Sequence, residues 1–134
     1  MATATAAQRR ELAKTAYDAF LAACPARRVL DRVSDKWVTL VLNALAGGAL
    51  RYAELGRIIA GASEKMLTQT LRALERDGLV TRTVTASVPV RVDYELTELG
   101  ASLLPVTRAL KAWAETHIAE IDAARTSYDQ VVAA

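Results

Sequence analysis

The sequence has one cysteine, one histidine and few aromatic side chains. Aromatic residues make up 5% of its 134 residues, and it contains three prolines and six glycines. A single cysteine cannot form an intramolecular disulfide, and one cysteine with one histidine offers too few ligands for a metal site. We therefore expect no metal and no cofactor. The simplest interpretation of Cys24 is a small buried hydrophobic residue.

Long apolar runs and enzyme motifs are also missing. No stretch of about 18 apolar residues occurs, which predicts that no segment spans a membrane. The N-terminal residues lack a charged region followed by an apolar core, so we expect no secretory signal and a cytoplasmic protein. There is no glycine-rich phosphate loop, nucleophile elbow or paired-histidine motif. Cys24 and His117 are one conceivable nucleophile–base pair, but no local pattern supports it, and we do not expect an enzyme.

The composition is that of a globular chain. Hydrophobic residues account for 52% and charged residues for 24%, with a net charge of only +2. The segment from Arg51 to Arg91 holds seven Lys and Arg residues against four Asp and Glu residues, a mild local excess of positive charge. We find no repeat and no linker, and expect residues 1–134 to form one domain.

The stretch from Ser63 to Gly78 has the pattern of one amphipathic helix. Ser63 is a good N-cap, and Gly78 can adopt the left-handed conformation that ends many helices. The apolar positions of this helix are Leu67, Leu71 and Leu74, and its polar face carries Lys65, Thr68, Gln69, Arg72 and Arg76. Such side chains can contact phosphates and base edges. The alternative is an ordinary surface helix, whose outer face is polar by default.

The flanking segments favour a winged helix-turn-helix. A short helix over residues 53–60, with Leu55, Ile58 and Ile59 expected to face inward, precedes the Ser63 helix. A turn at residues 61–62 joins the two helices. After Gly78 the period changes to two, which predicts strands over residues 79–86 and 88–96. The predicted fold is mainly α with a small β-hairpin, the wing. The candidate DNA contacts are Arg51, Ser63, Lys65, Thr68, Gln69, Arg72, Arg76, Arg82 and Arg91.

Two further helices are predicted outside this core of residues 24–97. The first covers residues 7–23 and the last residues 98–125, and both carry apolar stripes that a winged helix alone does not need. The stripe of the last helix is Leu99, Leu103, Val106, Leu110, Trp113 and Ile121, with a spacing that suits a helix–helix seam. We expect these to be dimerisation helices of a two-fold homodimer.

Cys24 falls between two predicted helices. Pro25 begins a short helix that runs to Val33, with Val29, Leu30 and Val33 expected to face inward. A helix N-terminus and the nearby Arg27 and Arg28 both favour the thiolate form of a cysteine.

Five motifs together resemble the HxlR family of bacterial winged-helix regulators. They are Cys24-Pro25-Ala26-Arg27, Asp35-Lys36-Trp37, Arg51-Tyr52-Ala53-Glu54-Leu55, the run from Met66 to Val80, and the run from Val88 to Gly100. The resemblance covers residues 24–117. It implies a MarR-like homodimer that binds operator DNA with inverted symmetry, with its terminal helices in the dimer interface. The chain departs from many members in the long segment before Cys24.

The resemblance also implies that the regulator responds to a chemical signal. Several members use a cysteine just before this proline to sense oxidants, quinones or aldehydes, and Cys24 matches that position. The alternatives are a regulator that binds a small apolar ligand near Trp37, Trp113 and Tyr17, and a winged helix that acts only as a protein-interaction module. The sequence does not decide between repression and activation.

Overall fold

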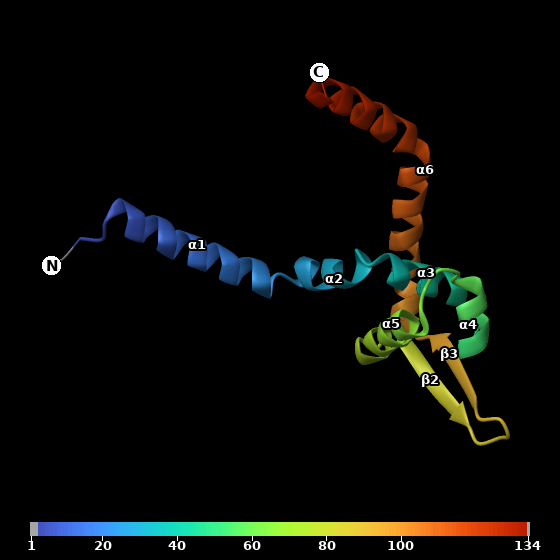
Figure 1. Ribbon diagram of the computed structural model, residues 1–134. Coiled ribbons are helices and arrows are strands. Elements are labelled where there is room, and N and C mark those ends of the chain that lie inside the picture. The colour runs from blue at the N-terminus through green and yellow to red at the C-terminus, as the bar shows by residue number, and fades with distance from the viewer. Residues whose placement is uncertain (1–2, 134) are drawn as a thin grey trace.

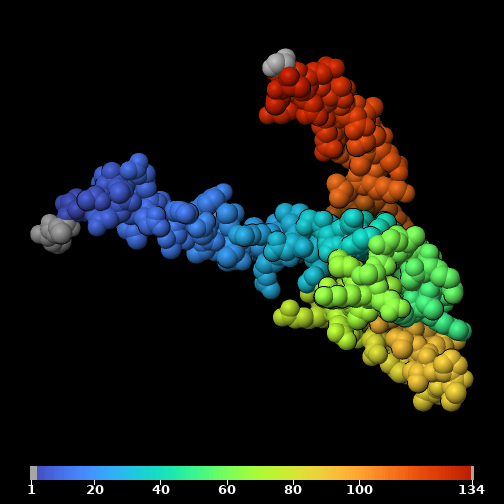
Figure 2. All heavy atoms as spheres, in the orientation of Figure 1, coloured from blue at the N-terminus to red at the C-terminus, as the bar shows by residue number. Residues whose placement is uncertain are grey.

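The computed structural model describes residues 3–133, and Figure 1 shows a small mixed body from which two helices extend. The elements in chain order are α1 (Ala6–Ala23), α2 (Pro25–Val33), α3 (Lys36–Leu45), β1 (Leu50–Arg51), α4 (Tyr52–Ile58), α5 (Glu64–Arg76), β2 (Val80–Thr85), β3 (Arg91–Leu96) and α6 (Glu98–Ala133). We call α1 and residues 108–133 of α6 the two arms. They leave the body in different directions (Figure 2).

Helix α3 lies at the centre of the core. Asp35 caps it by accepting a hydrogen bond from the Trp37 amide at 2.8 Å. Its buried residues are Val38, Val41, Leu42 and Leu45. Leu55 and Ile59 of the α4 segment and the three predicted leucines of α5 belong to the same cluster, together with Val80, Tyr94 and Leu104. The core therefore fixes α5 to the body through its apolar face.

The connection between α4 and α5 is longer than the sequence predicts, because it covers residues 59–63. Helix α4 ends at Ile58, and Gly61 takes a positive φ of 95° in the turn that follows. Ile58 and Ile59 were both expected to face inward, but Ile58 is 58% exposed while Ile59 is 4% exposed. Ile59 is the C-cap and has non-helical backbone angles (φ −93°, ψ 69°), so the chain turns at this point and Ile59 reaches the core while Ile58 faces solvent.

The wing is part of a three-stranded antiparallel sheet with the order β1-β3-β2. Strands β2 and β3 pair from Val80 opposite Leu96 to Thr85 opposite Arg91. The second wing strand was expected from residue 88, but β3 begins at Arg91, and residues 86–90 form the tip loop. Strand β1 adds Leu50 opposite Tyr94, a pairing that two residues are too few to reveal by alternation. The fold is a winged helix-turn-helix, mainly α, as predicted.

The end of α5, the start of β2 and the start of α6 are joined at Thr97. Its hydroxyl donates to the Gly78 carbonyl oxygen at 2.6 Å and accepts from the Gly100 amide at 3.0 Å. Gly78, with a φ of 75°, ends α5 as predicted. Gly100 is buried, and a Cβ atom there would collide with the carbonyl oxygen of Leu79. Only glycine allows α6 to start this close to the wing.

Helices α2 and α6 depart from the sequence predictions. Val29 and Leu30 of α2, expected inward, are 52% and 60% exposed. Helix α6 runs to Ala133, well beyond the expected end at residue 125, since no glycine or proline follows Pro105 to stop it. Within residues 3–133 no helix is long and apolar enough to cross a membrane.

Candidate nucleic-acid interface

Helix α5 presents a polar face opposite its buried leucines. The Ser63 hydroxyl accepts a hydrogen bond from the Met66 amide at 3.1 Å, which caps the helix as predicted. Lys65, Gln69 and Arg72 are exposed on the side away from the core. Cations and amide side chains at this spacing can reach both phosphate oxygens and base edges in the major groove. The N-terminal half of α5 therefore has the chemistry of a DNA-reading surface.

Thr68, also predicted to face DNA, is half-buried and already engaged. Its hydroxyl lies 3.1 Å from the Tyr52 hydroxyl, which also donates to the Glu64 carbonyl oxygen at 3.2 Å. Tyr52 is the first residue of α4, so this contact joins the two helices of the helix-turn-helix. The sequence analysis missed Tyr52, although it directly follows the candidate contact Arg51.

Tyr52 thus positions the N-terminal turn of α5 and limits what Thr68 can do. A hydroxyl that hydrogen-bonds to Tyr52 still has lone pairs, but its direction is set by the protein rather than by a base. We therefore assign Thr68 a place at the edge of the reading surface, beside Lys65 and Gln69.

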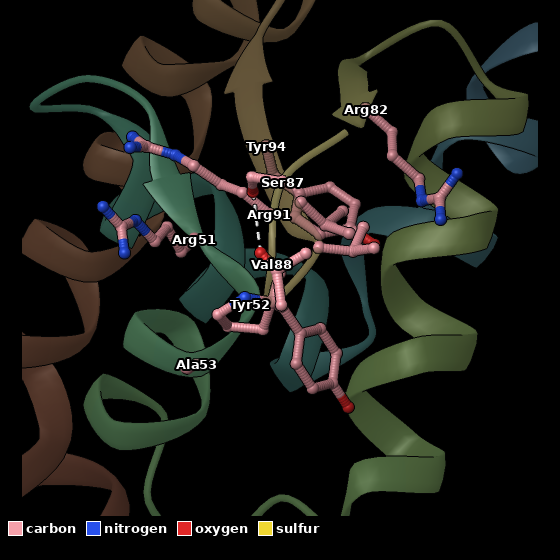
Figure 3. A pocket seen from close by; sticks show the side chains of 11 residues that line it. Arg51, Tyr52, Ala53, Arg82, Ser87, Val88, Arg91 and Tyr94 are labelled. Carbon is pink, nitrogen blue, oxygen red and sulfur yellow. Dashed lines mark hydrogen bonds between the residues drawn. The ribbon is translucent and has the colours of Figure 1, made fainter. Parts of the chain in front are cut away.

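Three arginines from three elements line one groove beside the wing. The groove holds about 730 Å³ and is bounded by Arg51, Arg82 and Arg91 together with Tyr52, Tyr94 and residues 87–90 (Figure 3). In Figure 3 the Arg82 side chain points away from Arg51 and Arg91, so the positive charge is distributed over both sides of the groove. An open, cation-lined groove beside an exposed reading helix fits a phosphate backbone.

Arg91 is the one arginine of this groove that forms an ion pair within residues 3–133. Its Nε lies 2.9 Å from Oδ2 of Asp93, two residues along the same strand. The hydrogen bond that Arg91 donates to Asp93, and then the negative charge of Asp93, raise the pKa of Arg91 above its ordinary value. Part of the Arg91 charge is therefore balanced within the protein, whereas Arg82 has no such partner among residues 3–133.

Arg76 lies apart from the other candidate contacts. It lines a second groove, of about 650 Å³, with Pro25, Arg28 and Arg32 of α2 and with Leu99 and Leu103 of α6. At the same end of α5, Asp77 accepts a hydrogen bond from Nε of Arg32 at 2.6 Å. Eight of the nine predicted DNA contacts thus lie on the first turns and middle of α5 or beside the wing groove, whereas Arg76, the last residue of α5, lies toward α2.

Cys24 is half-buried at the junction of α1 and α2. It ends α1 through its amide, which donates to the Leu21 carbonyl oxygen at 3.2 Å, and its own carbonyl accepts from the Arg28 amide at 3.2 Å. The neighbouring Arg27 and Arg28 are exposed. The long segment before Cys24 leads away from the body as α1 (Figure 1) and leaves the cysteine partly accessible.

Comparison with known proteins identifies the family. The profile of the HxlR-like helix-turn-helix family matches residues 32–122, a span that contains every candidate DNA contact. The HTH-type transcriptional regulator YtfH of Escherichia coli K12 is 43% identical over 106 residues, which cover 79% of this chain and 84% of that protein.

Solved structures agree with the sequence comparison. The transcriptional regulator ytfH from Salmonella typhimurium superposes with a TM-score of 0.72 at 41% identity, covering 80% of this chain and 96% of that one. The redox regulator HypR in its reduced form gives a TM-score of 0.70 at 35% identity, covering 75% and 99%. The chain is therefore a winged helix-turn-helix transcriptional regulator and belongs to the HxlR-like helix-turn-helix family.

Proposed function

We propose that this regulator binds operator DNA of two-fold symmetry as a homodimer, with α5 in the major groove. The observation that carries this proposal is the polar face of α5, where Lys65, Gln69 and Arg72 are exposed opposite the buried leucines. The arginine-lined wing groove lies beside it, where a phosphate backbone would run along the edge of the major groove.

The exposed apolar side chains of the arms support the proposal of a dimer. Large apolar side chains on them are exposed, among them Leu12 (66%), Phe20 (67%), Leu110 (55%) and Trp113 (55%). An isolated helix of the length of α1 is marginal in water, because most helix stability in proteins comes from packing of an apolar face. A second copy would cover these faces and set two α5 helices about 34 Å apart, one turn of DNA, or a small multiple.

The test uses wild-type protein and a variant with Arg72→Ala and Gln69→Ala. Wild type should select a duplex with inverted symmetry from a random-sequence library, and the footprint should be two-fold symmetric. The double variant should lose about 1–3 kcal/mol of binding free energy for each base contact removed. Arg108→Ala, an exposed arginine on α6, is the matched control. Unchanged affinity in the double variant would refute the assignment of α5.

Selection of no duplex by wild type would favour the alternative of a protein-interaction module. The structure of a single chain gives little support to the alternative of a regulator that binds a small apolar ligand. Trp37 is half-buried beside the core, whereas Tyr17 and Trp113 lie on different arms that diverge in Figure 1. Within one chain these three aromatic residues do not share a pocket, so a ligand site among them would need the second copy.

We propose further that Cys24 makes DNA binding sensitive to oxidants or electrophiles. Its position between an arm and α2, half-buried with exposed arginines nearby, supports this role, as does the likeness to the redox regulator HypR. With no second cysteine in the chain, Cys24 could bridge to Cys24 of the other copy, pair with a small thiol, or be alkylated.

Modified Cys24 would act through α2, which is held to the end of α5 by the Arg32–Asp77 pair. The test compares DNA release by diamide or a quinone in wild type and in Cys24→Ser. Wild type should release DNA and the variant should stay bound, with equal affinity before treatment. Equal responses of the two proteins would show that Cys24 is not the switch.

A further inference from the structure

The tip of the wing is an apolar surface. The phosphate contacts proposed for the arginines of the wing groove do not account for it. Residues 86–90 are Ala-Ser-Val-Pro-Val and contain no charged side chain. Val88 is fully exposed, and Val90 is 64% exposed. Figure 1 shows this loop at the far end of the hairpin, away from the body and from both arms. These side chains contribute nothing to the core of the protein.

The tip is also held in shape. The β2–β3 ladder continues to the last pair, Thr85 opposite Arg91, so the loop is closed at its base. Inside the loop the Ser87 hydroxyl donates to the Pro89 carbonyl oxygen at 2.7 Å. An ordered loop loses less conformational entropy on binding than a mobile one, which favours contact with a partner.

The position of the tip beside the wing groove indicates that its binding partner is DNA. The inference rests on the proposed function, in which α5 occupies the major groove. Arg51, Arg82 and Arg91 then face the adjoining phosphate backbone. An element that projects past one backbone strand from the major groove reaches the neighbouring minor groove. An uncharged tip cannot neutralise phosphates, and the minor groove, about 6 Å wide, has room for side chains of this size.

We propose that Val88, Pro89 and Val90 form an apolar wedge that enters the minor groove beside each half-site and bends the DNA. Apolar side chains used in this way partly unstack a base step and kink the duplex. The wedge reads how easily a step deforms rather than the pattern of its base edges. Flexible pyrimidine–purine steps such as TA should therefore be favoured at that position.

The test uses a duplex of about 30 base pairs selected by the wild-type protein, long enough for two half-sites one turn apart. The variant carries Val88→Ser and Val90→Ser, and the control is Ile58→Ser, an apolar residue of α4 that is 58% exposed and lies outside the wing and the arms. Affinity is measured by fluorescence anisotropy at several salt concentrations, and bending by energy transfer between dyes at the two DNA ends. Melting temperatures confirm that all three proteins are folded.

We expect the wing variant to bind about tenfold more weakly, because it loses apolar burial. Its salt slope should equal that of wild type, and its DNA should be less bent. A TA step replaced by a stiff A-tract under the wing should weaken wild type but not the variant, a coupling that a double-mutant cycle measures. The Ile58→Ser control should match wild type throughout.

Affinity within twofold of wild type together with an unchanged bend would overturn the wedge. In that case wild type would still select and footprint its duplex, so the proposed function would stand. An altered self-association at unchanged DNA binding would assign the tip to a protein contact and overturn the wedge as well. If wild type selects no duplex, the proposed function and the wedge fail together.

Discussion

Gly100 is a position at which the packing of this protein leaves no room for a side chain. It lies in the first turn of α6, and the space for a side chain is taken by the backbone carbonyl of Leu79. That carbonyl also accepts the Thr97 amide at 3.1 Å, so it cannot move without a further loss. The contact fixes where α6 leaves the body and hence the direction of that arm.

We predict that Gly100→Ala lowers the free energy of unfolding by about 1–3 kcal/mol, the usual cost of forcing an extra carbon into a packed site. Urea denaturation measures this as a lower midpoint. Gly47→Ala is the matched control, because no atom lies within 4 Å of a Cβ there. That change should be neutral or slightly stabilising, since alanine restricts the unfolded chain. An equal loss in both variants would contradict the packing argument.

Single residues also show why the site was only partly predictable. The cap at Ser63 and the stop at Gly78 depend on local backbone geometry, so the sequence was sufficient for both. The Tyr52–Thr68 contact joins residues 16 positions apart, and nothing in the local pattern reports it. The same holds for Arg32 and Asp77, which are 45 positions apart. Contacts of this range require the tertiary fold.

Among the elements, those with a long apolar period were the most predictable. The leucine period of α5 followed from spacing alone, because the core selects one face of the helix. Elements without a buried face were less well predicted. Exposed Leu30 of α2 and the end of α6 depart from expectation, because neither is constrained by the core of one chain.

The wing is the element whose role in affinity can be separated from its role in specificity. We predict that Arg82→Ala and Arg91→Ala each weaken binding to all duplexes alike and reduce the salt slope by about one unit, since each removes one phosphate contact. Arg91 should give the smaller effect, because Asp93 already balances part of its charge. Anisotropy titrations over a range of salt concentrations measure both quantities.

Arg108→Ala, far from the wing on α6, should leave the slope unchanged. A change in the preferred DNA sequence in either wing variant would show that these arginines contact bases instead. A slope that does not change in Arg82→Ala would remove this arginine from the phosphate contacts.

At the scale of the whole molecule, one copy of this chain is incomplete. The core is built around α3 and ends near Thr107, the last buried residue of α6. Beyond it the exposed side chains include Leu110, Trp113 and Ile118, and those of α1 include Leu12 and Phe20. Apolar faces of this extent on helices without tertiary packing are unfavourable in water, and in the proposed homodimer the arms of a second copy would cover them.

We therefore predict that the melting temperature rises with protein concentration, because association stabilises the folded state by mass action. A variant with Phe20→Asp and Leu110→Asp should dimerise more than about a hundredfold less well, since a buried carboxylate without a partner is costly. Sedimentation equilibrium measures the change. Val84→Asp, at a valine of the wing that is 50% exposed, should leave the dimer intact. Wild type that stays monomeric at micromolar concentration would contradict the prediction, and the arms would then need another partner.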